Sequence, residues 1–159
     1  METEVKNMVI ISPATGKIVD IERDKERTTI CIFLGPLDNH TQYAPVDGEV
    51  VDITKIKGSD MPAFLHAGKK NNAIETQIKT EYGEMRVRQM TGFFFRRIIN
   101  NLKKGDLIKQ KQEIGHIVLG SRVEIEIPEK FIILVKKSDR IEGGKTAIAE
   151  FKKEMGTIS

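Results

Sequence analysis

The sequence predicts a single mainly-β domain, a β-rich α+β fold whose short strands form a pseudo-symmetric hybrid barrel or sandwich with one or two helices. Many short β-branched runs are separated by glycine-containing turns, which is typical of such folds. A ten-residue pattern also occurs twice, at Ser12–Ile21 and Ala44–Ile53, and both copies read Pro-x-x-Gly-x-apolar-Val-Asp-Ile. Two copies of one turn-plus-strand unit predict two similar halves.

Composition agrees with one soluble domain of ordinary size. The chain has 159 residues, of which 39% are hydrophobic and 31% charged, and its net charge of +3 is spread along the sequence. No basic run is dense enough to predict nucleic-acid binding. The one cysteine, Cys31, cannot form an internal disulfide, so we expect a reducing compartment and a small core residue.

The N-terminal residues 1–7 are charged and polar and lack the apolar region of a signal peptide. No segment approaches the roughly 20 apolar residues that are needed to cross a membrane. The spacing of Asp, Glu, His and Cys predicts no metal site. We therefore expect a cytoplasmic protein that is at most peripherally attached to a membrane.

The domain is expected to span residues 12–151, between an N-terminal lead (1–11) and a frayed tail (152–159). A charged hairpin tip follows the first repeat, and a loop at 35–43 contains His40. Besides the runs that follow the two Pro-Gly turns, strands are expected at 28–34, 73–80, 85–90, after the turn at 104–106, at 122–128, at 131–135 and at 146–151.

The one clear helical candidate is Phe93–Leu102, because Phe94, Ile98 and Leu102 are spaced four apart. Two interpretations remain open for Phe93, Phe94 and Phe95. They form the buried face of that helix, or at least one of them points outward and, beside Arg96 and Arg97, contacts the bilayer interface.

A Gly-Ser pair, Gly120-Ser121, precedes the strand in which Val123, Ile125 and Ile127 alternate with charged residues. Glycine lacks a Cβ, so its carbonyl can be approached closely by the hydroxyl of the next residue. Attack by Ser121 on the Gly120 carbonyl would convert the peptide bond into an ester, and β-elimination with loss of ammonia would leave a pyruvoyl group. The alternative is that Ser121 is an ordinary turn hydroxyl.

Three separated segments resemble the phosphatidylserine decarboxylase family. The segment 32–48 places a histidine before an apolar-Pro-x-x-Gly turn, and 89–98 has the family's Gln-apolar-x-Gly-x-x-x-Arg-Arg-Ile pattern. The segment 119–128 is similar to the self-cleavage motif in the Gly-Ser-Arg-Val form of the short enzymes. Together with weaker agreement at 140–149, the resemblance spans roughly residues 12–151.

The resemblance implies a proenzyme that cuts itself between Gly120 and Ser121, giving a heterodimer of chains 1–120 and 121–159; it leaves a higher homo-oligomer open. The covalent cofactor would be a pyruvoyl group derived from Ser121, whose ketone forms a Schiff base with the substrate amine. The implied reaction converts phosphatidylserine or a related serine phospholipid at a membrane surface into the ethanolamine phospholipid.

The resemblance also implies that His40 is the base in self-cleavage. The chain departs from the family pattern at one position. In the family an aspartate is thought to orient this histidine, and the matching residue here is Thr15. A carboxylate orients an imidazole better than a hydroxyl does. Asp47, at the same place in the second repeat, or Asp38 could substitute, or the chain is an inactive homologue.

Two further features bear on function. Tyr43 stands where the family usually has arginine, so headgroup recognition could differ. A non-enzymatic alternative is a lipoyl- or biotinyl-like carrier or binding module modified at Lys25 on the charged hairpin tip, although the spacing from Lys25 to Ala44 is long for those domains.

Overall fold

The computed structural model describes residues 4–58, 72–91, 98–117 and 121–155, and every regular element in them is a β-strand. The strands are β1 (Glu4–Ile11), β2 (Gly16–Arg23), β3 (Arg27–Leu34), β4 (Thr41–Tyr43), β5 (Gly48–Ile56), β6 (Asn72–Thr80), β7 (Gly83–Thr91), β8 (Ile98–Asn100), β9 (Leu107–Ile108), β10 (Glu113–Ile117), β11 (Ser121–Pro128), β12 (Ile132–Ile133), β13 (Arg140–Ile141) and β14 (Ala147–Met155).

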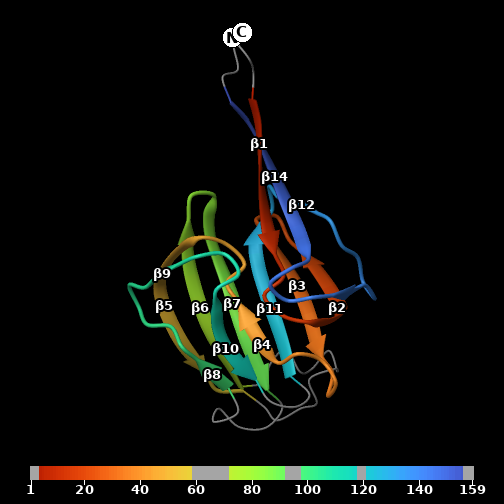
Figure 1. Cartoon of the computed structure of the whole chain (residues 1–159), viewed down its shortest axis with the longest axis vertical. Coiled ribbons are helices and arrows are strands. Elements are labelled where there is room, and N and C mark those ends of the chain that lie inside the picture. Colours follow the sequence, from red (N-terminus) through yellow and green to blue (C-terminus); the bar gives the residue numbers. More distant parts are fainter. Residues whose placement is uncertain (1–3, 59–71, 92–97, 118–120, 156–159) are drawn as a thin grey trace.

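These strands form one large sheet and two small ones. The large sheet has eight strands in the order β13-β2-β3-β11-β7-β6-β5-β9 and curls into a half-barrel (Figure 1). The small sheets, β1-β14-β12 and β4-β10-β8, have three strands each. The β1–β14 ribbon extends away from the half-barrel toward the two chain termini. All the strand pairs are antiparallel, which suits a sheet built from hairpins and returns.

The β-rich prediction is confirmed, but the predicted helix is wrong where it can be checked. Residues 98–100 form the strand β8, and the described part of the chain contains no helix. The other half of that prediction, including Phe93, Phe94 and Phe95, lies outside the described residues. The expected tail, 152–159, begins within β14, which continues to Met155 and pairs there with Glu4 of β1.

The two sequence repeats form β2 and β5, which have the same irregularity. The β2–β3 pairing shifts between Ile18 and Asp20, and the β5–β6 pairing shifts between Val50 and Asp52. Each aspartate then accepts a hydrogen bond from the backbone N–H of the following residue, at 2.9 and 3.0 Å. A β-bulge that occurs at the same place in both repeats shows that the halves share one local design.

A pair of reciprocal hydrogen bonds links the two halves. The backbone N–H of Ile11 donates to the Pro45 carbonyl (3.0 Å), and that of Tyr43 donates to the Pro13 carbonyl (2.9 Å). Ile11 and Tyr43 are 32 residues apart, and so are Pro13 and Pro45. The halves are therefore related by an approximate two-fold axis. Residues of β1 and β2 correspond to the residues 32 positions later in β4 and β5.

The two halves are interleaved along the chain. The second half is continuous from β4 to β10, whereas the first half consists of 4–34 together with 121–155. In the second half, β6 and β7 form a hairpin in which Thr80 pairs with Gly83. At the equivalent place in the first half, Leu34 pairs with Ser121, so the whole second half is inserted between β3 and β11.

The strand β11 is central in the sheet and buried on both faces. On one face Val123, Ile125 and Ile127 belong to the hydrophobic core and are fully buried. On the other face the charged residues Arg122, Glu124 and Glu126 are at most 9% exposed. Charged groups at this depth require partners.

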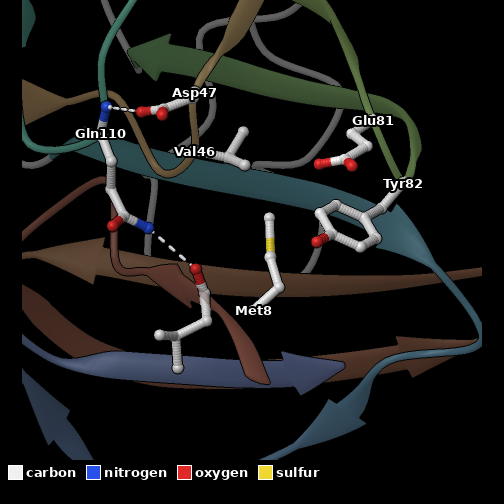
Figure 2. Close-up of a pocket in the computed structure, with 7 residues that line it drawn as sticks. Met8, Val46, Asp47, Glu81, Tyr82 and Gln110 are labelled. Atoms are coloured by element: carbon white, nitrogen blue, oxygen red, sulfur yellow. Dashed lines mark hydrogen bonds between the residues drawn. The ribbon is translucent and has the colours of Figure 1, made fainter. Parts of the chain in front are cut away.

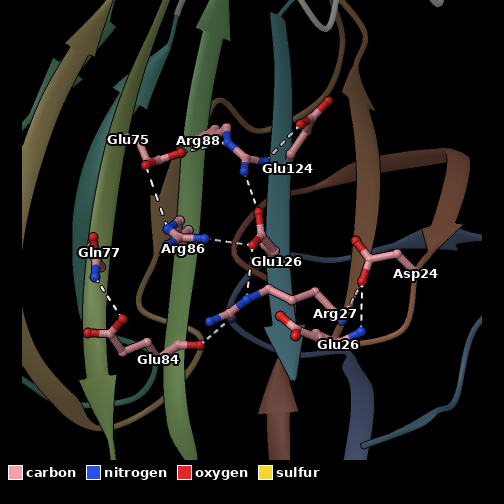
Figure 3. A network of polar contacts seen from close by, with 10 residues as sticks. All are labelled: Asp24, Glu26, Arg27, Glu75, Gln77, Glu84, Arg86, Arg88, Glu124 and Glu126. Atoms are coloured by element: carbon pink, nitrogen blue, oxygen red, sulfur yellow. Dashed lines mark hydrogen bonds and ion pairs between the residues drawn. The ribbon is translucent and has the colours of Figure 1, made fainter. Parts of the chain in front are cut away.

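Those partners form a charge network across β3, β11, β7 and β6 (Figure 3). Arg88 contacts three carboxylates: Glu75 (2.7 Å), Glu124 (3.1 Å) and Glu126. The other described members of the network are Arg27, Arg86 and Arg122. Burial alone would lower the pKa of Arg88, but its hydrogen bonds to the glutamates outweigh burial and raise the pKa.

Cys31 lies on β3 beside this network. It is fully buried, and its Sγ donates to a Glu124 carboxylate oxygen at 3.7 Å. Burial, together with the negative charge of Glu124, raises the pKa of the Cys31 thiol to about 12. The thiol is therefore protonated at neutral pH and is a poor nucleophile, because the thiolate is the reactive form.

We predict that Arg88→Met lowers the free energy of unfolding by about 2 kcal/mol, between the values for exposed and fully buried ion pairs. The substitution keeps the unbranched apolar stem of the side chain but leaves the glutamates around it without their shared cation. Urea denaturation followed by circular dichroism measures the change. Lys145→Met, which breaks the exposed pair with Glu142, is the control and should change stability much less. Equal effects of the two substitutions would show that the network contributes no more than a surface pair.

We also predict that Cys31 does not react with 5,5′-dithiobis(2-nitrobenzoic acid) in the folded protein at pH 8. Burial and the raised pKa of the thiol both oppose the reaction. In denaturant the single thiol should react fully and rapidly, which serves as the internal control. Fast reaction of the native protein would contradict the burial of Cys31.

Candidate functional site

Ser121 is the first residue of β11 and points to the core side of the sheet, as Val123 and Ile125 do. Its Cα is paired with Leu34 of β3. The side chain is fully buried, and its Oγ has no hydrogen-bond partner among the described residues. A buried hydroxyl without a partner costs about 1–3 kcal/mol, so its presence at a strand end is a sign of function.

His40 lies in the connection between β3 and β4. Its carbonyl accepts hydrogen bonds from the Ile117 backbone N–H (3.0 Å) and from Gln42 Nε2 (2.7 Å). These two bonds fix the backbone of the loop against β10. The ring Nε2 is buried and, within the described part of the chain, has no hydrogen-bond partner.

The sheet brings Ser121 and His40 to the same end of the half-barrel. Leu34, which pairs with Ser121, begins the connection that contains His40, and Ile117, which binds the His40 carbonyl, ends the strand before Ser121. Among the described residues, three have a buried side-chain nitrogen or oxygen without a hydrogen-bond partner: Ser121, His40 and Arg122, the last through Nη2. A hydroxyl and an imidazole nitrogen, both desolvated, are the groups that a nucleophile and its base require.

A second histidine lies beside the first. The rings of His40 and His116 have centroids 6.4 Å apart and planes inclined by 57°. His116 is half-buried and lies on β10 between the buried residues Gly115 and Ile117. It therefore borders the same site.

The two carboxylates proposed as substitutes for the family aspartate lie in different places. Asp38 is on the His40 loop, where it accepts a hydrogen bond from the Gly35 N–H (2.8 Å) and pairs with Arg140. Asp47 accepts a hydrogen bond from the Gln110 N–H (2.7 Å) and lines a cavity with Tyr82, at the opposite end of the sheet from Ser121. Of the two carboxylates, only Asp38 lies on the same loop as His40, at the Ser121 end of the sheet.

Thr15 borders the His40 loop. Its Oγ1 accepts a hydrogen bond from the Gly143 N–H (2.9 Å), and it lines a cavity of about 410 Å³ together with Asn39, Arg140 and Glu142. This cavity is open to solvent and contains both cationic and hydroxyl groups. It is the nearest described cavity to His40 in which a polar headgroup could be held.

Tyr43, the other departure from the family pattern, lies beside this cavity. Its hydroxyl accepts a hydrogen bond from Asn39 Nδ2 (3.1 Å). Its ring packs on Gly144, where a Cβ would lie 3.2 Å from the ring and where φ is +75°. Glycine is needed at residue 144 for both reasons.

A chain of buried amides leads from the His40 loop into the core. The Gln42 side chain donates to the His40 carbonyl and accepts from Gln89 (2.9 Å), and Gln89 in turn accepts from Asn100 (2.9 Å). Asn100 also donates to the Thr76 hydroxyl (2.9 Å). Gly115 has room beside this chain only because it lacks a Cβ, which would lie 2.5 Å from Gln89 Nε2.

The sequence reasoning did not predict this amide chain. Gln89 stood within a matched segment without an assigned role, and Gln42 and Asn100 were not considered. The sequence did contain a signal for this chain: each of these amide residues occupies a position on the apolar face of its strand. A fully satisfied polar chain of this kind fixes one arrangement of the loop that it supports.

Two predicted features of the site cannot be placed. Gly120, on the carbonyl side of the expected cut, lies outside the described residues, and so do the phenylalanines proposed for membrane contact. Among the residues that are described, no helix has the length and apolarity needed to cross a bilayer.

Comparison with known proteins identifies the family. The sequence model described as "Phosphatidylserine decarboxylase" matches residues 2–149. The chain is 41% identical over 152 residues to a Methanosarcina barkeri protein named as an archaetidylserine decarboxylase proenzyme, covering 96% of this chain and 73% of the relative.

Two further relatives agree. A Carboxydothermus hydrogenoformans protein named as a phosphatidylserine decarboxylase proenzyme is 38% identical over 152 residues, covering 90% of this chain and 71% of the relative. An Archaeoglobus fulgidus archaetidylserine decarboxylase homologue is 39% identical over 138 residues, covering 86% and 68%. The match runs through both halves of the fold and through the Ser121 end of the sheet, and the chain therefore belongs to the phosphatidylserine decarboxylase family, whose members are carboxy-lyases of phospholipid biosynthesis.

Proposed function

We propose that this chain is the proenzyme of a pyruvoyl-dependent decarboxylase that acts on the serine headgroup of a phospholipid, archaetidylserine or phosphatidylserine. The observation that supports it most is the pair of buried, unpartnered groups, Ser121 Oγ and His40 Nε2, at one end of the sheet. The family match supports the phospholipid substrate. Both lipids have the same serine headgroup.

The first step in this proposal is self-cleavage. His40 Nε2 takes the proton of the Ser121 hydroxyl, and Ser121 Oγ attacks the carbonyl carbon of Gly120. The bond from that carbon to the Ser121 nitrogen breaks, and an ester replaces the amide. Elimination across the Ser121 Cα–Cβ bond then releases the carboxylate of the 1–120 chain, and hydrolysis releases ammonia.

The burial of Ser121 fits this chemistry. A desolvated hydroxyl without a competing hydrogen bond is free to attack, and water is excluded from an ester that must eliminate rather than hydrolyse. A pyruvoyl group at residue 121 supplies a ketone that accepts the electron pair released with carbon dioxide. His40 and the half-buried His116 are the candidates for returning a proton to the decarboxylated carbon.

The sheet pairing supports a heterodimer that survives the cut. The 121–159 chain would contribute β11, which lies between β3 and β7 of the larger chain. It would also contribute β13, paired with β2, and β14, paired with β1. The charge network crosses the same boundary through Glu124 and Glu126, so the two chains remain one folded unit.

In this proposal His40 is oriented without the family aspartate. The carbonyl of His40 is held by Ile117 and Gln42, so the backbone is positioned without a carboxylate. Asp38 can contribute through the loop, although its oxygens already bind Gly35 and Arg140. An inactive homologue, the second candidate favoured by Thr15, would remain a single uncut chain.

We predict that the wild-type chain separates in denaturant into two fragments that meet between residues 120 and 121, and that Ser121→Ala remains whole. The substitution removes the only atom that can attack and then be eliminated. Intact-mass spectrometry measures both outcomes. Thr28→Val, which removes a buried hydroxyl at the other end of β3, is the matched control and should be cut normally. A wild-type chain of full-length mass would favour the inactive homologue, and an adduct on Lys25 would favour a carrier.

We predict that His40→Ala slows self-cleavage by about 100-fold or more, the usual contribution of a positioned base. The uncut precursor should accumulate while circular dichroism shows a folded protein. His116→Gln is the comparison, because it alters the neighbouring ring and should be cut faster than His40→Ala. If the order of the two variants is reversed, His116 is the base.

The role of the carboxylates can be tested with the same assay. Asp38→Asn should slow the cut if Asp38 orients the loop, and Asp47→Asn should leave it unchanged because Asp47 lies at the far end of the sheet. Thr15→Asp restores the family residue beside the His40 loop. An increase in cleavage rate would show that orientation limits the wild-type chain.

A further inference from the structure

A second cavity, of about 310 Å³, lies at the end of the sheet opposite Ser121 (Figure 2). Its lining includes Met8, Val46, Asp47, Glu81, Tyr82 and Gln110. Asp47 and Glu81 lie on either side of Val46 in this view, and Met8 and Val46 form an apolar wall between them. The site therefore combines two carboxylates with an apolar surface.

The N–H groups of Gln110 beside this cavity are already in use. The Gln110 backbone N–H donates to Asp47, and its side-chain amide donates to the Val9 (2.8 Å) and Pro45 (3.0 Å) carbonyls. What remains for a ligand is the second oxygen of Asp47, the Glu81 carboxylate and the Gln110 amide oxygen. All of these are acceptors, so they select a ligand that donates.

Tyr82 provides an independent sign that the cavity takes a ligand. The residue is only 8% exposed, and its ring packs edge-on against Phe131 and Phe151, with centroids 6.2 and 5.2 Å away. Its hydroxyl points into the cavity beside Met8 (Figure 2), whereas its backbone N–H donates a hydrogen bond to the Thr80 hydroxyl (3.0 Å), away from the phenol. Burial, with the nearby Glu81, raises the pKa of Tyr82, so the phenol stays neutral.

The two-fold relation gives this cavity a place in the fold. The offset of 32 residues matches Thr15 to Asp47 and His40 to Met8. The strand pairing matches the Leu34–Ser121 pair to the Thr80–Gly83 pair, so Gly83 stands where the first half has Ser121. The cavity is thus the second half's counterpart of the Ser121 end. Its matching positions, Gly83 and Met8, carry neither a hydroxyl nor an imidazole. A ligand can therefore bind here whether or not the chain is cut at Ser121.

We propose that this cavity binds a small aliphatic amine. An ammonium group donates hydrogen bonds to Asp47 on one side of Val46 or to Glu81 on the other, with the Tyr82 hydroxyl as a further acceptor, and the alkyl chain packs on Met8 and Val46. A linear diamine can reach both carboxylates and binds more tightly than a monoamine. The proposal does not depend on self-cleavage, and the Ser121→Ala chain should bind equally well.

The test uses tyrosine fluorescence, because the chain has two tyrosines and no tryptophan. In a Tyr43→Phe background, Tyr82 is the only fluorophore. Titration with butylamine, and then with putrescine, should give a saturable change in emission. 1-Butanol, which has the same alkyl chain without the charge, should give none.

Charge-removing variants decide whether the carboxylates hold the amine. Asp47→Asn and Glu81→Gln should each weaken binding by about tenfold or more, the usual effect of losing a charged hydrogen bond. Glu113→Gln, at an exposed carboxylate that lines neither cavity, is the matched control and should not change the affinity. The same titrations on the Ser121→Ala chain separate this proposal from the proposed function.

Three results would overturn the proposal. Equal binding of 1-butanol would show an apolar cavity only. Equal weakening by Glu113→Gln would show nonspecific attraction to surface charge. A saturable response to calcium chloride but not to putrescine would show a metal site instead of an amine site.

Discussion

Burial of β11 on both faces and along both edges is the constraint on which the rest of the structure depends. The strand is central in the large sheet, so its backbone groups are satisfied by β3 and β7. One face forms the middle of the core, and the other requires the charge network, since Glu124 and Glu126 would otherwise be desolvated without partners. The arginines of β7 and the register between β7 and β11 follow from that requirement.

The same strand determines where the chemistry can occur. Because β11 begins at Ser121 on its core-facing side, the hydroxyl lies inside the half-barrel, where water does not reach it. The His40 loop closes over that end through bonds made by its carbonyl, and the amide chain from Gln42 to Asn100 holds the loop in one arrangement. In the proposed mechanism, packing and hydrogen bonds to the loop backbone therefore position His40 without the family's carboxylate.

Much of this could be predicted from sequence, and the failures have physical reasons. Alternation identified most strands, and the repeated Pro-x-x-Gly pattern identified the two halves. The helix prediction was wrong because a spacing of four residues does not distinguish a helix from a strand. Residues four apart lie on one face of a helix, and residues an even number apart also lie on one face of a strand. Ile98 and Leu102 are buried while Ile99 is 50% exposed, which is the period of a strand. The strand β1 was missed because its partner, β14, is more than a hundred residues away and its own first residues are polar.

Prediction of the site was limited in a similar way. The resemblance supplied Ser121 and His40 together with their expected roles, and the fold places them at one end of the sheet. Sequence position could not decide between Asp38 and Asp47, because Asp38 is two residues before His40 and Asp47 is seven residues after it, at the place that Thr15 has in the first repeat. Only the sheet order separates them, since the two halves run to opposite ends.

The interleaving of the halves has a consequence for how the protein is made. During synthesis the ribosome releases β3 early, then the complete second half, and only afterwards β11. Until β11 emerges, β3 and β7 each lack a neighbour, and Ser121 has no interior to be buried in. If self-cleavage requires that interior, the bond cannot break before β11 has folded between β3 and β7, so the cut occurs only after the two halves have assembled.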